Sequence, residues 1–143
     1  MSHQIDLLQK SDVEFFDAPI SFSANPATND YLSFDTARFN SASVVNNTGS
    51  LTLIQGSYLI NAVVAVDMSG NLSNYIEYQL EVDSVLKGNV SSTVQTSKMG
   101  IDAASFAFST ASSVTLKIKL TTVGGSISNA PDYSFIYIKR VDL

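Results

Sequence analysis

Three acidic side chains in one segment and a single histidine are the first candidates for acid–base chemistry in this chain of 143 residues. Glu77, Glu81 and Asp83 share one parity, and a pair of carboxylates is the machinery of glycoside hydrolysis. In a strand, however, residues of one parity form one face, and a charged face is normally solvated. His3 would serve a Ser-His-Asp triad only if its imidazole were held in place. We therefore predict a protein without catalytic activity.

The sequence offers equally little for binding a metal or a cofactor. The turn "DMSGN" (67–71) has oxygen ligands, but it lacks the acid count and the twelve-residue spacing of a calcium loop. A hairpin turn is the simpler interpretation. The chain has no cysteine, which excludes disulfides and Cys-zinc sites. Asn-x-Ser/Thr sequences begin at Asn46, Asn71 and Asn89, and chance accounts for them in a chain this rich in Asn and Ser. We expect no metal and no cofactor.

Composition favours a β-rich protein with uncharged loops. Charged residues make up 15% of the chain, while Ser, Thr and Asn number 22, 10 and 10, and these three compete with a helical backbone for hydrogen bonds. Lys and Arg do not cluster beyond residues 139–140, which argues against nucleic-acid binding. No apolar stretch reaches the length of about 20 residues that crosses a bilayer. The absence of disulfides favours a bacterial, viral or intracellular origin. The N-terminus has no signal-peptide pattern, so we expect assembly in the cytoplasm and a place on a virion or particle surface.

Short apolar segments follow one another along the chain, separated by Gly, Asn, Ser and Pro. Eight or nine strands at this spacing predict one all-β domain, a jelly-roll sandwich of about 8–10 antiparallel strands. The strands are expected at residues 19–24, 31–35, 50–54, 58–67, 75–83, 90–96, 103–109, 114–122 and 133–141.

The expected strands are of two kinds. Segments 75–83 and 114–122 alternate apolar and polar residues, which indicates one buried and one solvated face. In segments 58–66, 103–109 and 133–141, apolar residues of both parities occur. A sandwich has one core, so a sheet that is apolar on both faces needs a cover, and no helix is expected to provide it. Loops are one possible cover, but further copies of the chain are the more economical one.

Several segments resemble the complement-globular-head and tumour-necrosis-factor superfamily. The resemblance rests on "ISFSA", "YLSFD" and "GSLTLIQGSYLINAVVAV", on the Gly56-x-Tyr58 opening of a long two-faced strand, and on the aromatic strand Tyr133 to Val141. It covers roughly residues 18–143 and is looser at "TASSV" (110–114), where the family often has Gly-Asp. No collagen-like stalk precedes the domain, and no calcium or receptor motif of the family is matched.

The resemblance implies a ten-stranded jelly roll that forms compact homotrimers, and we expect a phage or bacterial member. The trimer's inner sheet would face both the core and the three-fold axis. The candidates for interface anchors are the aromatic residues of the two-faced strands, although parity does not say which of them face the axis: Tyr58, Phe106, Phe108, Phe135 and Tyr137.

The first 18 residues are predicted to form an arm that precedes a jelly-roll domain at residues 19–143. Residues 1–35 hold six acids and one base, a net charge of −5, whereas residues 36–143 hold seven of each. Disorder, packing beneath a trimer, and docking on a larger assembly are the three interpretations of this arm. The apolar residues that would anchor it to such an assembly are Ile5, Leu7, Leu8, Phe15 and Phe16.

Two functions fit these features. The first is a non-enzymatic structural or attachment protein on a particle surface, namely a phage virion decoration or fibre-head protein docked to a capsid or tail through its arm. The alternative is a soluble trimeric recognition module that binds a glycan or a protein receptor through its loops. Neither function requires a catalytic residue, a nucleic acid or a membrane span.

Overall fold

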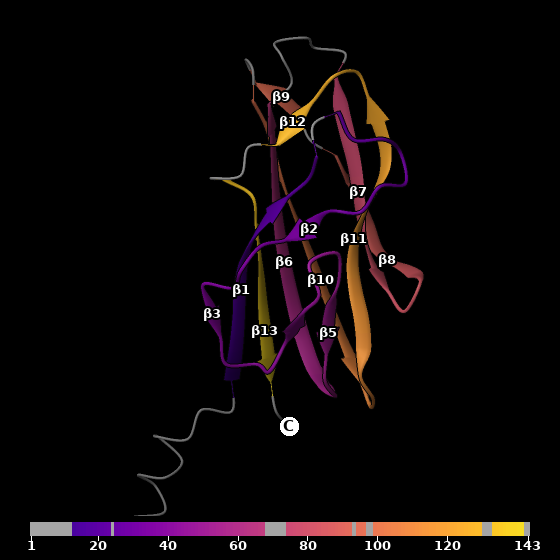
Figure 1. Ribbon diagram of the computed structural model, residues 1–143. Coiled ribbons are helices and arrows are strands. Elements are labelled where there is room, and N and C mark those ends of the chain that lie inside the picture. The colour runs from indigo at the N-terminus through magenta and orange to yellow at the C-terminus, as the bar shows by residue number, and fades with distance from the viewer. Residues whose placement is uncertain are drawn as a thin grey trace, which may run out of the picture.

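The computed structural model describes residues 13–23, 25–67, 74–92, 94–96, 99–129 and 133–141. The elements in these ranges are all β-strands (Figure 1). They are β1 (Val13–Ser21), β2 (Ser33–Phe34), β3 (Phe39–Asn40), β4 (Val45–Asn46), β5 (Leu51–Leu53), β6 (Gly56–Asp67), β7 (Tyr75–Val82), β8 (Val85–Ser92), β9 (Val94–Thr96), β10 (Met99–Thr110), β11 (Val114–Gly124), β12 (Ser128–Asn129) and β13 (Phe135–Val141).

The strands form two antiparallel sheets. The larger, 8-stranded sheet has the order β2-β1-β13-β6-β10-β9, with β3 paired to β1 and β12 paired to β6. The smaller, 5-stranded sheet has the order β4-β5-β11-β7-β8. The chain passes between the two sheets after β3, β5, β6, β8, β10 and β11, and this repeated exchange between two antiparallel sheets is typical of a jelly roll. The fold class predicted from the sequence is therefore confirmed.

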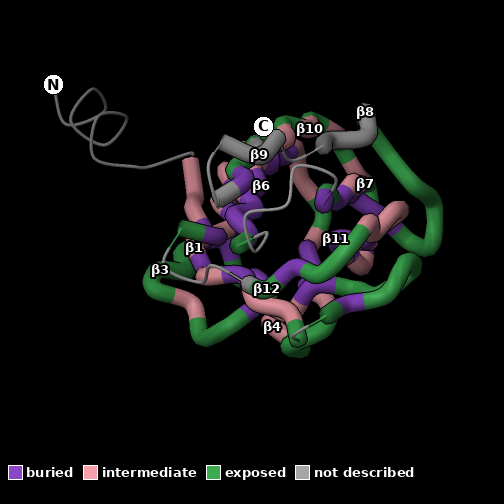
Figure 2. The backbone as a smooth tube through the Cα atoms, turned by 90° about the horizontal axis from the view of Figure 1, so that it is seen from above, coloured by how far each residue is buried: buried purple, intermediate pink, exposed green. Residues whose placement is uncertain are grey.

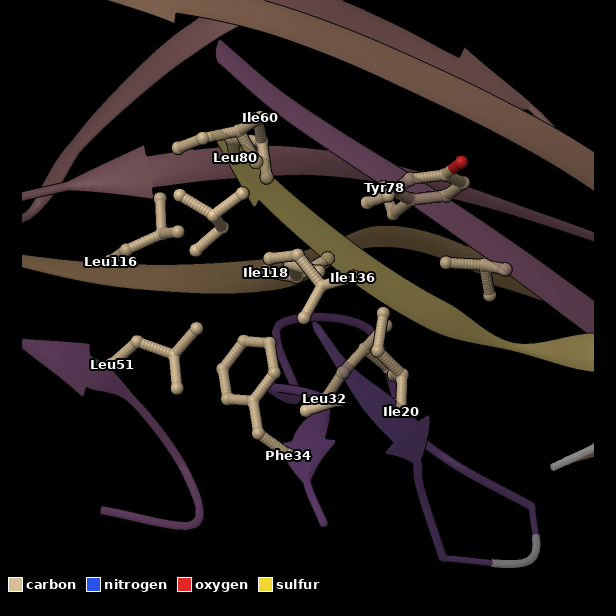
Figure 3. Packing of buried hydrophobic residues seen from close by; sticks show 14 of the residues in the cluster. Ile20, Leu32, Phe34, Leu51, Ile60, Tyr78, Leu80, Leu116, Ile118 and Ile136 are labelled. Atoms are coloured by element: carbon tan, nitrogen blue, oxygen red, sulfur yellow. The ribbon is translucent and has the colours of Figure 1, made fainter. Parts of the chain in front are cut away.

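The hydrophobic core fills the space between the two sheets. Figure 2 shows buried residues on β1, β6, β7 and β11, whereas exposed residues gather in the connecting loops. Side chains from both sheets and from the segment before β2 interdigitate in Figure 3, where Ile60 and Ile136 of the larger sheet meet Leu116 and Ile118 of the smaller one. All four of these residues are fully buried. Close packing of this kind supplies most of the stability of a sandwich.

The alternation of β7 and β11 places their apolar residues in this core, as the sequence predicts. Ile76, Tyr78 and Leu80 of β7 are buried, and so are Leu116 and Ile118 of β11. The register of β7 against β11 shifts between Leu120 and Thr122, which marks a β-bulge. The smaller sheet therefore has one core face and one face that carries polar side chains.

The first strand begins earlier than the sequence-based boundary at residue 18. Residues Val13 to Pro19 pair with β13 in continuous register, from Val13–Val141 to Pro19–Phe135. Residues 13–18 are therefore part of the sandwich, and only residues 1–12 of the expected arm lie outside the described chain. The acids of this stretch suggested an arm, but Glu14 and Asp17 each pair with an arginine.

Candidate subunit interface on the larger sheet

The larger sheet has an outer face, which points away from the smaller sheet and carries many apolar side chains. On β6, Tyr58, Ile60 and Ala62 point into the core, so the residues between them face outward. The strand register extends this face across four strands, because Phe15, Lys139, Leu59 and Ala107 form one cross-strand row. A second row is formed by Pro19, Phe135, Val63 and Ala103. We call these residues, together with Tyr137 and Ile101, the outer face.

Aromatic rings gather on the β1–β13 side of the outer face. The rings of Phe15 and Tyr137 lie 5.6 Å apart between centroids. The Arg38 guanidinium lies 6.0 Å from the centroid of Phe135, and the same guanidinium forms a 2.7 Å ion pair with Asp17. These contacts restrict the aromatic side chains, and a restricted side chain loses less entropy when a partner buries it.

One polar row crosses the centre of the outer face. Asp17, Tyr137, Asn61 and Ser105 are cross-strand neighbours on β1, β13, β6 and β10. The Ser105 hydroxyl donates a hydrogen bond of 2.5 Å to Asn61 Oδ1. The face thus has two mainly apolar rows, one of which includes Lys139, on either side of a polar row, and a mixture of this kind suits a specific protein contact.

The structure divides the five aromatic interface candidates between the two faces of the sheet. Phe135 and Tyr137 lie on the outer face. Tyr58, Phe106 and Phe108 have the opposite parity and pack against the core. Phe108 lies between the other two, with its ring centroid 5.6 Å from Tyr58 and 5.5 Å from Phe106. Sequence parity alone did not separate these two groups because both faces of the strands are apolar.

Tyr58 closes one end of the core. Its hydroxyl donates a 2.6 Å hydrogen bond to the carbonyl oxygen of Ile54. Burial raises the pKa of the Tyr58 phenol, and the Arg140 guanidinium beside it opposes part of that effect. Arg140 is itself buried on β13, where its Nη1 donates to Glu14 and its Nη2 donates a 2.8 Å bond to the carbonyl of Gln55. This network joins β1, β13 and the β5–β6 loop.

The five anchor candidates of the N-terminus separate in a similar way. Phe16 is fully buried in the core, and Phe15 lies on the outer face beside Tyr137. Both therefore belong to the sandwich rather than to an arm. Ile5, Leu7 and Leu8 lie outside the described residues.

The prediction that Glu77, Glu81 and Asp83 share a solvated face is wrong for Glu81. Glu81 is buried and accepts a 3.0 Å hydrogen bond from the Tyr31 hydroxyl. Burial first, and this hydrogen bond second, raise the pKa of Tyr31. The Lys117 ammonium lies 4.8 Å from the Tyr31 ring centroid. The contacts with Glu81 and Lys117 therefore attach Tyr31, in the segment before β2, to strands β7 and β11. Within the described ranges, no three His, Cys, Asp or Glu residues are grouped so that they could hold a metal.

Comparisons with known proteins define the class of fold. No protein-family model and no curated protein matches the sequence. Among solved structures, the chain is similar to murine APRIL at pH 5.0, with a TM-score of 0.65, 9% identity, and coverage of 90% of this chain and 99% of that one. It is also similar to the globular domain of zebrafish complement 1qA protein, with a TM-score of 0.60, 8% identity, and coverage of 91% and 98%.

The chain therefore has the jelly-roll fold of the tumour-necrosis-factor and complement-head proteins, as the sequence resemblance implied. At identities this low the likeness concerns the fold alone. Among the residues that the structure describes, no helix has the length and apolar character of a membrane span.

Proposed function

We propose that the chain is a non-enzymatic binding module that works as a homotrimer, assembled through the outer face of its larger sheet. The observation that carries this proposal is the apolar content of that face. Leu59 is 39% exposed, and Ile101, which pairs with Ala65 six residues farther along β6, is 52% exposed. Phe135 and Tyr137 lie between these two positions on the neighbouring strand β13. Apolar side chains gathered on one face of a sheet are typical of a protein interaction site.

The number of subunits comes from the resemblance in fold. The superfamily that the sequence resembles forms trimers about its inner sheet, which corresponds here to the larger sheet. In a closed three-fold ring each contact is heterologous, so two different patches of the chain meet at every contact. The outer face supplies one of these patches, and Phe135 and Tyr137 are its proposed anchors.

One end of the sandwich holds both ends of the described domain, and the opposite end carries loops that could bind a partner. Val13 pairs with Val141 at one end, so the chain enters and leaves the described domain there. The opposite end carries the loops at residues 25–30 and 125–127, and the amide of Asn25 donates to the carbonyl of Ile127. Loops presented on a rigid sandwich are the usual position of recognition residues. We propose that this end binds a protein receptor or a glycan.

The test of the assembly is the mass of the protein in solution. Sedimentation equilibrium at micromolar concentration should give three times the 15.4 kDa chain mass. Leu59→Glu places a charge on the outer face without touching the core and should give monomers that retain the wild-type circular dichroism spectrum. A wild-type monomer, or a trimer unaffected by this change, would refute the proposed interface.

A structural role on a particle surface, such as a virion decoration or fibre head, is a second candidate. It is supported by the position of Val13 beside Val141, because three such ends on one side of a trimer would present three N-terminal segments together. Linked weak contacts of this kind raise avidity by about 10²–10⁴. Proteomics of purified particles from the source organism tests this role: the protein should be present in a fixed ratio to the major shell protein. Its absence from the particles would leave the recognition module as the function.

A further inference from the structure

Two neighbouring cavities lie at the end of the sandwich where Val13 enters the sheet. The first is polar, has a volume of about 220 Å³, and is lined by residues that include Gln55, Ser57 and Arg140. The second has a volume of about 210 Å³. Ser109 and Thr110 line both cavities, so the two cavities adjoin at the end of β10, and we call the pair the end groove.

The second cavity is the apolar half of the end groove. Its wall is made by Val82, Phe106, Phe108 and Val114. Phe106 and Phe108 pack against the core but remain partly exposed. Lys87, which is exposed, also lines this half. An apolar wall beside one ammonium group fits an apolar segment that carries an acid.

The strand register places the start of the described chain close to this groove. Val13 pairs with Val141, Val141 with Ser57, and Ser57 with Ser109. Three steps between adjacent strands correspond to about 14 Å. The five residues from Leu8 to Val13 span up to about 17 Å when extended. Leu8 can therefore reach Ser109, and the residues before Leu8 can enter the apolar half.

The sequence of residues 5–12 matches the groove in order as well as in length. The polar stretch "QKSD" (9–12) is next to Val13 in the sequence, and the polar half is the part of the groove nearer to Val13. The apolar stretch "IDLL" (5–8) is farther from Val13 in the sequence, and the apolar half is the farther part of the groove. Asp6, between Ile5 and Leu7, has the charge that complements Lys87.

We propose that residues 5–12 dock in the end groove of their own chain, with Leu7 and Leu8 against Phe106 and Phe108 and with Asp6 facing Lys87. This assignment goes beyond the proposed function, because it needs neither the trimer nor a particle. It gives the acidic, apolar N-terminal segment a partner within the same molecule.

A disulfide trap tests the docking, since the chain has no cysteine of its own. Under mild oxidation the full-length double variant Leu8→Cys/Ser109→Cys should form a bond within one chain, seen as a faster-migrating monomer in a non-reducing gel. The matched control is Leu8→Cys/Ser126→Cys, with the second cysteine on an exposed position beyond the far end of β11. It should remain reduced.

The outcomes separate the possible occupants. A cross-linked dimer would mean that a second copy fills the groove, and equal trapping of both pairs would mean that the segment samples the surface without docking. Either result, or the absence of any trapping, overturns the proposal. Because the readout is the topology of the bond, it is independent of the sedimentation test of the trimer.

Charge and apolar variants provide a second, independent measurement on the otherwise wild-type chain. Trypsin should cleave after Lys10 slowly when the segment is docked, and Leu7→Ser/Leu8→Ser should speed this cleavage by about tenfold, because proteolysis follows the open population. Lys87→Glu should also speed cleavage, and adding Asp6→Lys should restore protection. Cleavage at one rate in all four proteins would overturn the proposal.

Discussion

The ring of Phe15 on β1 lies 5.6 Å from the ring of Tyr137 on β13, with 31° between the ring planes. Both rings lie on the outer face, so the contact joins a residue first assigned to the N-terminal arm with a proposed interface anchor. Tyr137 therefore packs against a second aromatic ring, and tyrosine is among the residue types that dominate interfaces.

Tyr137→Ala should weaken self-association and leave the fold intact. Removing an interface aromatic costs on the order of 2 kcal/mol or more per contact, so we expect dissociation at clearly higher protein concentrations in analytical ultracentrifugation. Tyr75→Ala is the matched control, because Tyr75 is 41% exposed on the smaller sheet. If both variants dissociate at the wild-type concentration, Tyr137 is not an anchor.

Two adjacent residues of β6 should respond in opposite ways to truncation. Ile60 is fully buried, and Ile60→Ala should lower the free energy of unfolding by about 2–5 kcal/mol. Leu59 is 39% exposed on the outer face, so Leu59→Ala should leave the stability of the isolated subunit nearly unchanged and weaken assembly. Urea unfolding under dissociating conditions, combined with sedimentation, separates the two effects. Equal stability losses at both positions would contradict the assigned faces.

Stability should fall in alkali because the folded state retains the Tyr58 proton. Burial raises the pKa of Tyr58 above its ordinary value of 10.0, so above about pH 10 the unfolded chain releases the proton more readily, and the free energy of unfolding decreases as the pH rises. Tyr58→Phe should make this decrease shallower. Urea unfolding at a series of pH values measures it, with Tyr75→Phe as control. Parallel pH curves for wild type and Tyr58→Phe would show that Tyr58 does not contribute.

Glu14→Gln should destabilise the monomer through Arg140. The Arg140 side chain is only 9% exposed and pairs with Glu14, whose side chain is 26% exposed. Losing a hydrogen bond to a buried charged group costs about 1–3 kcal/mol. Thermal unfolding should show the loss, whereas Asp17→Asn, at an ion pair whose arginine side chain is 54% exposed, should have a smaller effect. A larger effect at Asp17 would contradict this ranking.

A chelator should leave the melting temperature of the protein unchanged. The described residues contain no group of three metal-ligating side chains, and the sequence has no cysteine. Differential scanning fluorimetry with and without EDTA measures this. A drop of several degrees would reveal a stabilising metal, since loss of a bound ion lowers stability by mass action.

The regular alternation of long strands was predictable from the sequence, and the short or two-faced elements were not. The sequence of residues 75–83 and 114–122 predicted β7 and β11 because apolar residues of the core face alternate there with polar residues of the opposite face. The two-residue strands β3, β4 and β12 are too short to show any period. The first strand was placed at residue 19 because Glu14 and Asp17 interrupt the apolar pattern, and their partners, Arg140 and Arg38, are remote in sequence.

The sequence identified the strands that form the candidate interface, but it did not identify which of their residues lie on the outer face. Apolar residues of both parities identified β6, β10 and β13 as two-faced. Assigning Phe135 to the outer face and Phe106 to the core required the cross-strand register, which the sequence does not contain. The end groove is likewise invisible in the sequence, because Lys87, Phe106 and Ser109 meet only through the pairing of distant strands.

The place of β13 in the larger sheet also determines when the protein can fold during synthesis. β13 lies between β1 and β6, yet it is the last of the described strands to leave the ribosome. Until residues 135–141 emerge, a nascent chain presents the facing edges of β1 and β6 without their shared neighbour, and unpaired edges favour aggregation. The larger sheet is therefore completed only after residues 135–141 have left the ribosome, and a chain that stalls earlier keeps the facing edges of β1 and β6 unpaired.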